Sequence, residues 1–246
     1  IPLDADINEV KSLIDSLHPK DTEHSLIKIG SQSDGGYLIP DDLFGVKSCF
    51  SPGVSDNSNF ENELSKKYNI KSFLCDNSVD SPSINNKAFV FDKLHLDVVN
   101  TTNTIRFEDW FEKYNDKSTS NILQMDIEGN EYKCILDTPV EVFKNFRILI
   151  VEFHDFDLLF NNFHLNMMSS VFKKLLNHFE ILHLHPNNCC GTFEHNNIKI
   201  PKVIEFTFIN KNRLKSDNYP LVKSFKNSLD FKNLTHKKEL NWESFK

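Results

Sequence analysis

Acidic and imidazole side chains follow several short apolar segments of this sequence, and such segments are typical of buried strands. Asp76 follows SFLC, and Asp126 follows SNILQM. Glu152 and His154 follow ILIV, and His185 ends a further apolar segment. Ligands of open α/β sheets bind outside the carboxyl ends of the strands. We therefore expect these side chains along one rim of a sheet, where carboxylates and imidazoles act as general bases or bind cations.

The end of the first expected strand, SPGVSDNS at residues 51–58, contains a single glycine. Gly53 lacks a Cβ, so a ligand can approach the backbone closely there. The G-x-G-x-x-G pattern of dinucleotide sites and the P-loop pattern are both absent. S-adenosylmethionine carries no phosphate, so one glycine and a ribose-binding acid, Asp76, suffice for it. This pattern favours a methyl donor over NAD, with a turn glycine and a loop acid as the alternative for the two residues.

The elements that carry these groups alternate along the chain. Apolar periodicity predicts strands over 46–51, 72–75, 88–91, 120–125, 147–153, 179–184 and 203–210, and helices over 4–17, 58–68, 107–114, 131–136 and 165–178. The alternation predicts a doubly wound, mostly parallel, seven-stranded α/β sheet. About 18 residues without a helical pattern precede the last strand, which favours a C-terminal antiparallel hairpin. The pair Gly35–Gly36 indicates a turn.

One segment resembles the signature of a known family. Residues 118–132, STSNILQMDIEGNEY, are similar to that of the FkbM-type methyltransferases, in which a strand ends in K-x-D-[IV]-E-G-x-E. The segments DGGY at 34–37, VEFH at 151–154 and HPNN at 185–188 resemble the same family, and the similarity spans about residues 27–210. Two features depart from the family pattern: the donor loop lacks G-A-x-x-G, and Gln124 replaces the common Lys.

The resemblance implies a class I, Rossmann-like methyltransferase that moves a methyl group from S-adenosylmethionine to a hydroxyl, often on a sugar. The implied acceptor is a nucleotide-sugar or a surface glycan, and a non-sugar alcohol or binding without catalysis are the alternatives. His154 is the expected general base and His185 the second choice, because a sugar hydroxyl is a poor nucleophile. The expected donor contacts are Ser51, Pro52, Gly53, Val54, Asp76, Asn77 and Asp126, and the expected acceptor contacts are Asp34, Tyr37, Asn187 and Asn188.

Asp126 and Glu152 should lie side by side, because they end neighbouring strands of this fold. Two carboxylates about 5 Å apart repel by about 3 kcal/mol at an effective dielectric constant of about 20, so a positive group must offset them. A Mg or Mn ion held by Asp126, Glu152 and His185 is one solution. A shared proton, a lysine, the donor sulfonium and structural hydrogen bonds are the others. Glu128 and Glu131 are expected to cap the helix that follows.

Composition and charge exclude several classes of protein. The chain has 246 residues with 22 Phe, which is enough to form a core, and its apolar runs are too short to cross a bilayer. The net charge of −7 argues against a nucleic-acid binder. Residues 211–246 carry a local charge of +5, which leaves −12 for residues 1–210. This extension is expected to be either a solvated, lysine-rich segment or a site for an anionic partner.

The number and spacing of the cysteines indicate whether the protein works in a reducing or an oxidising compartment of the cell. The five cysteines, two of them adjacent, form no disulfide framework and favour a reduced, cytoplasmic protein. The run from His183 to His195, with Cys189 and Cys190, is a weak zinc pattern because adjacent cysteines rarely ligate one ion well. The acidic start, IPLDADINEV, lacks the basic region of a signal peptide. We expect one methyltransferase domain, with an entry segment at 1–45, a Rossmann-like core at 46–210 and a basic extension at 211–246, and leave oligomerisation open.

Overall fold

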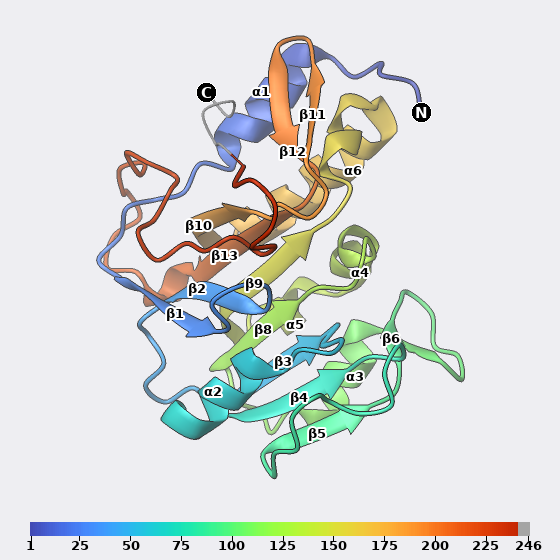
Figure 1. Cartoon of the computed structure of the whole chain (residues 1–246), viewed down its shortest axis with the longest axis vertical. Coiled ribbons are helices and arrows are strands. Elements are labelled where there is room, and N and C mark those ends of the chain that lie inside the picture. Colours follow the sequence, from blue (N-terminus) through green and yellow to red (C-terminus); the bar gives the residue numbers. More distant parts are fainter. Residues whose placement is uncertain (241–246) are drawn as a thin grey trace.

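Seven strands form the central sheet of the molecule (Figure 1). The structure is a computed structural model, and it describes residues 1–240. The strands lie in the order β10-β13-β9-β8-β3-β4-β5, and β13 runs antiparallel to both of its neighbours. The predicted doubly wound sheet and its C-terminal antiparallel hairpin are confirmed. The strands are β3 (Ser48–Pro52), β4 (Lys71–Cys75), β5 (Phe89–Asp92), β8 (Asn121–Met125), β9 (Phe146–Phe153), β10 (Phe179–Pro186) and β13 (Ile204–Asn210).

The strand order creates a crevice between β3 and β8. The chain runs outward from β3 through β4 to β5, and then continues on the other side of β3 with β8 and β9. Helix α2 (Asn59–Tyr68), which follows β3, and helix α4 (Glu131–Asp137), which follows β8, pack on opposite faces of the sheet. Open α/β sheets bind their ligands outside the carboxyl ends of the strands where the helices diverge in this way, here β3 and β8.

Apolar side chains bury both faces of the sheet, and this explains the unbroken hydrophobic run of β9, whose residues are all buried. The first face packs Phe50, Leu149 and Phe206 against helices. The second face packs Ile148 and Ile150 against α2 and a β-hairpin. The helices on the first face are α1 (Ile7–Ser16), α3 (Phe107–Tyr114), α4, the short α5 (Val140–Phe143) and α6 (Asn162–Leu176), and the hairpin on the second is β1 (Leu26–Gly30) with β2 (Gly36–Pro40).

The β1–β2 hairpin turns at the predicted glycine pair. Gly35 has φ +73°, and a Cβ on Gly36 would lie 1.9 Å from the carbonyl oxygen of Ser31, so larger residues do not fit this turn. The hydroxyl of Thr207 on β13 donates to the carbonyl oxygen of Leu38 on β2 at 2.7 Å. This bond holds the hairpin over the sheet face near the crevice.

Short elements fill the connections that show no clear periodicity. Between β10 and β13 lies a small hairpin of β11 (Thr192–His195) and β12 (Ile198–Pro201). Its Phe193 contacts Phe160 of the 3-10 helix Phe156–Phe160. A further pair, β6 (His95–Leu96) and β7 (Thr104–Ile105), has two residues in each strand, which is too short to show an alternating pattern.

The basic extension contacts the rest of the molecule at several points of its described length, up to residue 240. It passes a 3-10 turn at Lys211–Arg213 and then lies along the segment between α1 and β1, where the amide of Val222 donates to the carbonyl oxygen of Pro19 at 3.0 Å. It then returns over β10 and β13 (Figure 1). Asn233 is buried there. Most of the other described residues of the extension are exposed, as expected for a solvated segment, and residues 241–246 lie outside the described residues.

Across residues 1–240, every helix is too short or too polar to cross a membrane.

Candidate active site

A row of polar side chains crosses the strands near their carboxyl rim. His185 on β10 pairs directly with Glu205 on β13, and Glu205 pairs directly with Glu152 on β9. Because Met125 pairs with Val151, Asp126 lies next to Glu152 in the row. Directly paired residues point to the same side of a sheet. The register therefore places three acids and one imidazole together on the face that the β1–β2 hairpin covers.

His154 lies at the centre of several carboxylates. Its Nε2 atom is 3.8 Å from Asp126 Oδ1, 3.8 Å from Glu152 Oε1 and 3.5 Å from Glu128 Oε2. Its Nδ1 atom donates a hydrogen bond to Glu131 Oε1 at 3.1 Å. The structure thus brings together Asp126, Glu152 and His154, which the sequence predicts along one rim of the sheet, and it adds Glu131 as the partner that orients the imidazole ring.

Burial and mutual charge shift the pKa values of this group. Burial raises the pKa of Asp126 to about 8, and the charges of Glu131 and Glu128 act in the same direction. Burial and the charge of Asp126 raise the pKa of Glu152 well above its usual range. Burial opposes the charged form of His154, but its hydrogen bond to Glu131 and the charges of Glu131 and Asp126 raise its pKa to about 9. Protons on these acids and an imidazolium at His154 therefore together offset the carboxylate repulsion that the sequence predicts.

One oxygen of Asp126 lacks a hydrogen-bond partner. The Asp126 side chain keeps 26% of its surface exposed, yet its Oδ1 atom is buried and accepts no hydrogen bond. A buried polar atom without a partner costs roughly 1–3 kcal/mol. The carboxylate can recover this cost by accepting a hydrogen bond from a bound ligand, which makes Asp126 a candidate for ligand binding.

The turn after β8 explains how Glu131 reaches His154. Glu128 and Gly129 have φ angles of +56° and +99°, so the chain reverses tightly here. Glu131 accepts from the amides of Ile127 at 2.9 Å and Gly129 at 3.1 Å. The side chain of Glu131 thus holds the turn before α4 and the imidazole at once. Its expected capping role appears as these two bonds, whereas its contact with a residue 23 positions away carried no signal in the sequence.

Gly53 also has a packing role that the sequence did not predict. Its φ is +84°, and a Cβ at this position would lie 1.5 Å from the backbone oxygen of Asp126. The amide of Gly53 donates to the carbonyl oxygen of Cys75 at 2.9 Å. The missing side chain therefore lets the ends of β3, β4 and β8 converge.

The other residues predicted to contact the donor differ in whether their polar atoms are free to bind a ligand. Asp76 is buried and accepts from the amides of Ser55 at 2.8 Å and Ser78 at 2.7 Å. Ser51 is fully buried, and its hydroxyl contacts Glu61 and Gln124 inside the protein. Their polar atoms are thus engaged within the chain. Of the remaining contacts, Pro52 is buried and accepts from the amide of Asp126 at 3.2 Å, Asn77 is half-buried, and Val54 lines the cavity described next.

A small cavity lies between the β1–β2 turn and the ends of β3 and β8. Its volume is about 100 Å³, whereas ligand pockets usually measure about 300–1,000 Å³. The five predicted site residues that line it are Asp34, Tyr37, Gly53, Val54 and Asp126. A ligand as large as a nucleoside must therefore widen this cavity. The parts of its wall outside the sheet are the hairpin turn with Asp34, the loop 54–57, helix α2 and Glu128.

The predicted acceptor contacts all lie near the acid row. The hydroxyl of Tyr37 is buried and accepts from Gln124 Nε2 at 3.1 Å. Asn187 Nδ2 donates to Glu152 Oε1 at 2.9 Å. Asp34 Oδ1 accepts from Asn233 Nδ2 at 3.2 Å. Asn188 instead holds the extension, because it donates to the carbonyl oxygen of Leu234 and accepts from its amide.

His185 belongs to a different group from the predicted one. Its Nε2 atom contacts Asn233 Oδ1 at 3.0 Å, and its Nδ1 atom is 3.6 Å from Asp230 Oδ1. Among residues 1–240, the third member of the group formed by Asp126 and Glu152 is His154. The grouping of His185 with these two acids as metal ligands is therefore wrong. β10 lies two strands away from β9, and the side chain of Glu205 fills the row between them.

Sequence reasoning did not identify Glu205, Asp230 and Asn233 as site residues. Glu205 is buried, and burial raises its pKa. The sequence does contain a signal for Glu205, because this residue is the one charge within the segment IEFTFIN. Asp230 and Asn233 carried no such signal, because they lie in a polar segment without periodicity and reach the site through the path of the extension.

The family model described as Methyltransferase FkbM domain matches residues 50–182, and none of the curated proteins matches the chain. Among solved structures, M. capricolum TrmK with S-adenosyl-homocysteine has a TM-score of 0.34 and 11% identity, covering 71% of this chain and 66% of that one. The Methanococcus jannaschii fibrillarin pre-rRNA processing protein has a TM-score of 0.40 and 9% identity, covering 76% and 83%. The family model spans more than half of the sequence, and the chain therefore belongs to the FkbM methyltransferase family.

Proposed function

We propose that this protein is an O-methyltransferase that transfers a methyl group from S-adenosylmethionine to a sugar hydroxyl of a nucleotide-sugar or a glycan. The observation that carries the proposal is the geometry around Asp126. Its unpartnered Oδ1 atom lies 3.8 Å from the His154 ring, beside Glu152 and next to the crevice of the sheet. Cysteine usage supports a cytoplasmic reaction, because all five cysteines are free.

The charge of the rim supports a cationic donor. Asp34, Asp126 and Glu128 line the cavity, and Glu152 lies behind Asp126. The sulfonium of S-adenosylmethionine is positive, so these carboxylates attract it and stabilise it. The adenosine part extends past the end of β3 toward Asp76, whose carboxylate would exchange its backbone bonds for ribose hydroxyls. Donor binding requires that the cavity widen from its present 100 Å³.

Methyl transfer itself needs alignment and a proton acceptor. The acceptor oxygen attacks the methyl carbon in line with the sulfur, so an O–CH3 bond forms as the S–CH3 bond breaks, and S-adenosylhomocysteine leaves. The hydroxyl proton passes to His154. The imidazolium of the empty site must first lose its own proton, and the arriving sulfonium favours this loss because it takes over the charge balance with Asp126 and Glu152. Glu131 then holds the neutral ring in place through Nδ1.

A divalent cation is the alternative way to balance the same acids. Asp126, Glu152 and His154 offer one ligand atom each within 4.8 Å of one another, and Mg or Mn would lower the pKa of a bound hydroxyl. We expect chelation with EDTA to abolish turnover if the ion takes part, and added Mg or Mn to restore it. Full activity after exhaustive chelation leaves the imidazolium as the balancing charge.

Calorimetry with S-adenosylhomocysteine tests the donor step first. We expect binding near one molecule per chain, weakened by Asp126→Asn, with Glu141→Gln as an exposed control that leaves the affinity unchanged. Absence of binding contradicts the proposed function. Panels of nucleotide-sugars and of non-sugar alcohols then test the acceptor, and binding without turnover on either panel favours a domain that binds the nucleoside without catalysis.

A further inference from the structure

Two histidines and an aspartate form a second cluster, outside the group around His154. His183 and His185 lie two residues apart on β10, so they project to the same side of the strand. Asp230 reaches them from the extension. His183 Nε2 is 2.8 Å from Asp230 Oδ1, and His185 Nδ1 is 3.6 Å from the same oxygen. The two imidazole nitrogens and this oxygen lie within 4.8 Å of one another, and both rings are buried.

Neighbouring hydrogen bonds determine which nitrogen of His185 carries a proton. Asn233 Nδ2 donates to the carboxylates of Glu205 at 2.6 Å and Asp34 at 3.2 Å. Because carboxylates only accept, Asn233 must turn its Oδ1 atom toward His185 Nε2, 3.0 Å away. Nε2 therefore carries the hydrogen. In the neutral ring, Nδ1 therefore carries a lone pair that is directed at Asp230. The distance from Nδ1 to Asp230 Oδ1 is too long for a hydrogen bond.

This arrangement has the features of a metal-binding histidine. Such a residue donates its second ring N–H to an oxygen atom that fixes the tautomer, and here Asn233 supplies that oxygen. Asp230 is prepared in the same way, because its Oδ2 atom accepts from the amide of Asn227 at 2.8 Å and leaves Oδ1 for the histidines. Two imidazole nitrogens and one carboxylate oxygen are ligands typical of zinc.

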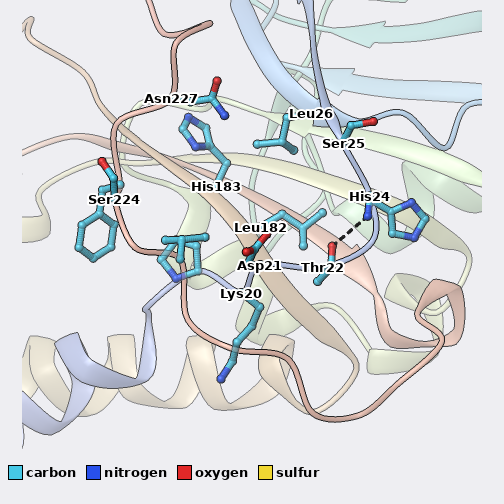
Figure 2. A pocket seen from close by; sticks show the side chains of 13 residues that line it. Lys20, Asp21, Thr22, His24, Ser25, Leu26, Leu182, His183, Ser224 and Asn227 are labelled. Carbon is cyan, nitrogen blue, oxygen red and sulfur yellow. Dashed lines mark hydrogen bonds between the residues drawn. The ribbon is translucent and has the colours of Figure 1, made fainter.

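A cavity beside His183 provides room for a fourth ligand. It has a volume of about 240 Å³ and lies between the segment at residues 19–26 and the extension. Figure 2 shows the ring of His183 directed toward Asn227 in this cavity. A water molecule needs only about 30 Å³, so solvent can complete a tetrahedral site from this side.

We propose that His183, His185 and Asp230 bind a zinc-type divalent cation that fastens the extension to β10. The ion would join residues 45 or more positions apart in the chain. Because Asn233 follows Asp230 by three residues, the same ion would hold Asn233 between Asp34 and Glu205, at the acceptor side of the rim. The site itself does not depend on the proposed methyl transfer.

Cobalt titration of the chelated full chain tests the site. We expect one Co²⁺ per chain, with the visible absorption of a four-coordinate ion, and competition by Zn²⁺. His183→Ala and the nearly isosteric Asp230→Asn should each abolish this absorption. Asn233→Ala, which removes only the supporting oxygen, should weaken the affinity by about 10–100-fold. His178→Ala and Glu152→Gln should leave the spectrum unchanged, which separates this site from the group around His154.

Other results overturn the proposal. Lack of stoichiometric Co²⁺ or Zn²⁺ binding by the wild-type chain shows that the cluster is only a histidine–aspartate ion pair. An unchanged absorption in Asp230→Asn places the ion elsewhere. Circular dichroism shows which variants remain folded, and X-ray absorption of the zinc-loaded wild type, expected to report two imidazoles, gives a result that needs no variant.

Discussion

The two halves of the rim are built in different ways. In the half at the ends of β3 and β4, polar side chains are engaged by backbone groups: Asp76 binds amides at Ser55 and Ser78, and Gly53 lies against the backbone of Asp126. The half at the ends of β9, β13 and β10 gathers carboxylates from segments far apart in the chain, with Asn233 of the extension among them. The acid of the first half is thus already paired within the chain, whereas the second half brings together acids whose like charges a ligand or a proton must balance.

His154→Ala offers the strongest test of this difference, because it removes the positive charge of the second half. We expect turnover to fall by about 10²–10⁴-fold, the usual contribution of a general base, while the fold persists. Steady-state methylation assays of the variant measure this. His178→Ala is the matched control, and equal activity of the His154 variant would contradict the role of the imidazole.

Gly53→Ala tests the half of the rim at the ends of β3 and β4. We expect this change to destabilise the fold by about 3 kcal/mol, because strain at positive φ is joined by a clash with the backbone of Asp126. Gly191→Ala is a close control, since Gly191 has φ +74° and no atom within 4 Å of the added Cβ, so only about 1 kcal/mol of strain is expected. Urea denaturation measures both. Equal losses in the two variants would show that residue 53 has room for a side chain.

Glu61→Gln examines a buried acid on the β3 side. Burial raises the pKa of Glu61 to about 7 from its usual 4.5, so the folded state binds a proton that the unfolded chain has lost. This stabilisation is complete below pH 4.5 and disappears as the pH rises to about 7, by up to about 3 kcal/mol. Denaturation at pH 5 and pH 8 should show a smaller difference in Glu61→Gln than in the wild type. Parallel pH profiles would mean that Glu61 titrates normally.

Asn188→Ala has the smallest expected effect and concerns the second half. It removes the hydrogen bonds to the backbone of Leu234, which should cost about 1 kcal/mol. We expect faster amide hydrogen exchange at residues 227–238 and unchanged exchange in β3 and β4. Exchange that rises equally in both halves would show that the extension is not a separate layer.

The sequence by itself predicted most of the elements within a few residues, because burial of β9 and the apolar faces of the helices leave periodic signals. The strand-end rule also placed Asp126, Glu152 and His154 together. The tertiary structure alone decided the partners: Glu205 separates His185 from Glu152, Glu131 orients His154, and the extension brings Asp230 and Asn233 to β10. Such contacts depend on strand register and on the path of distant segments, and local residue patterns do not encode either one.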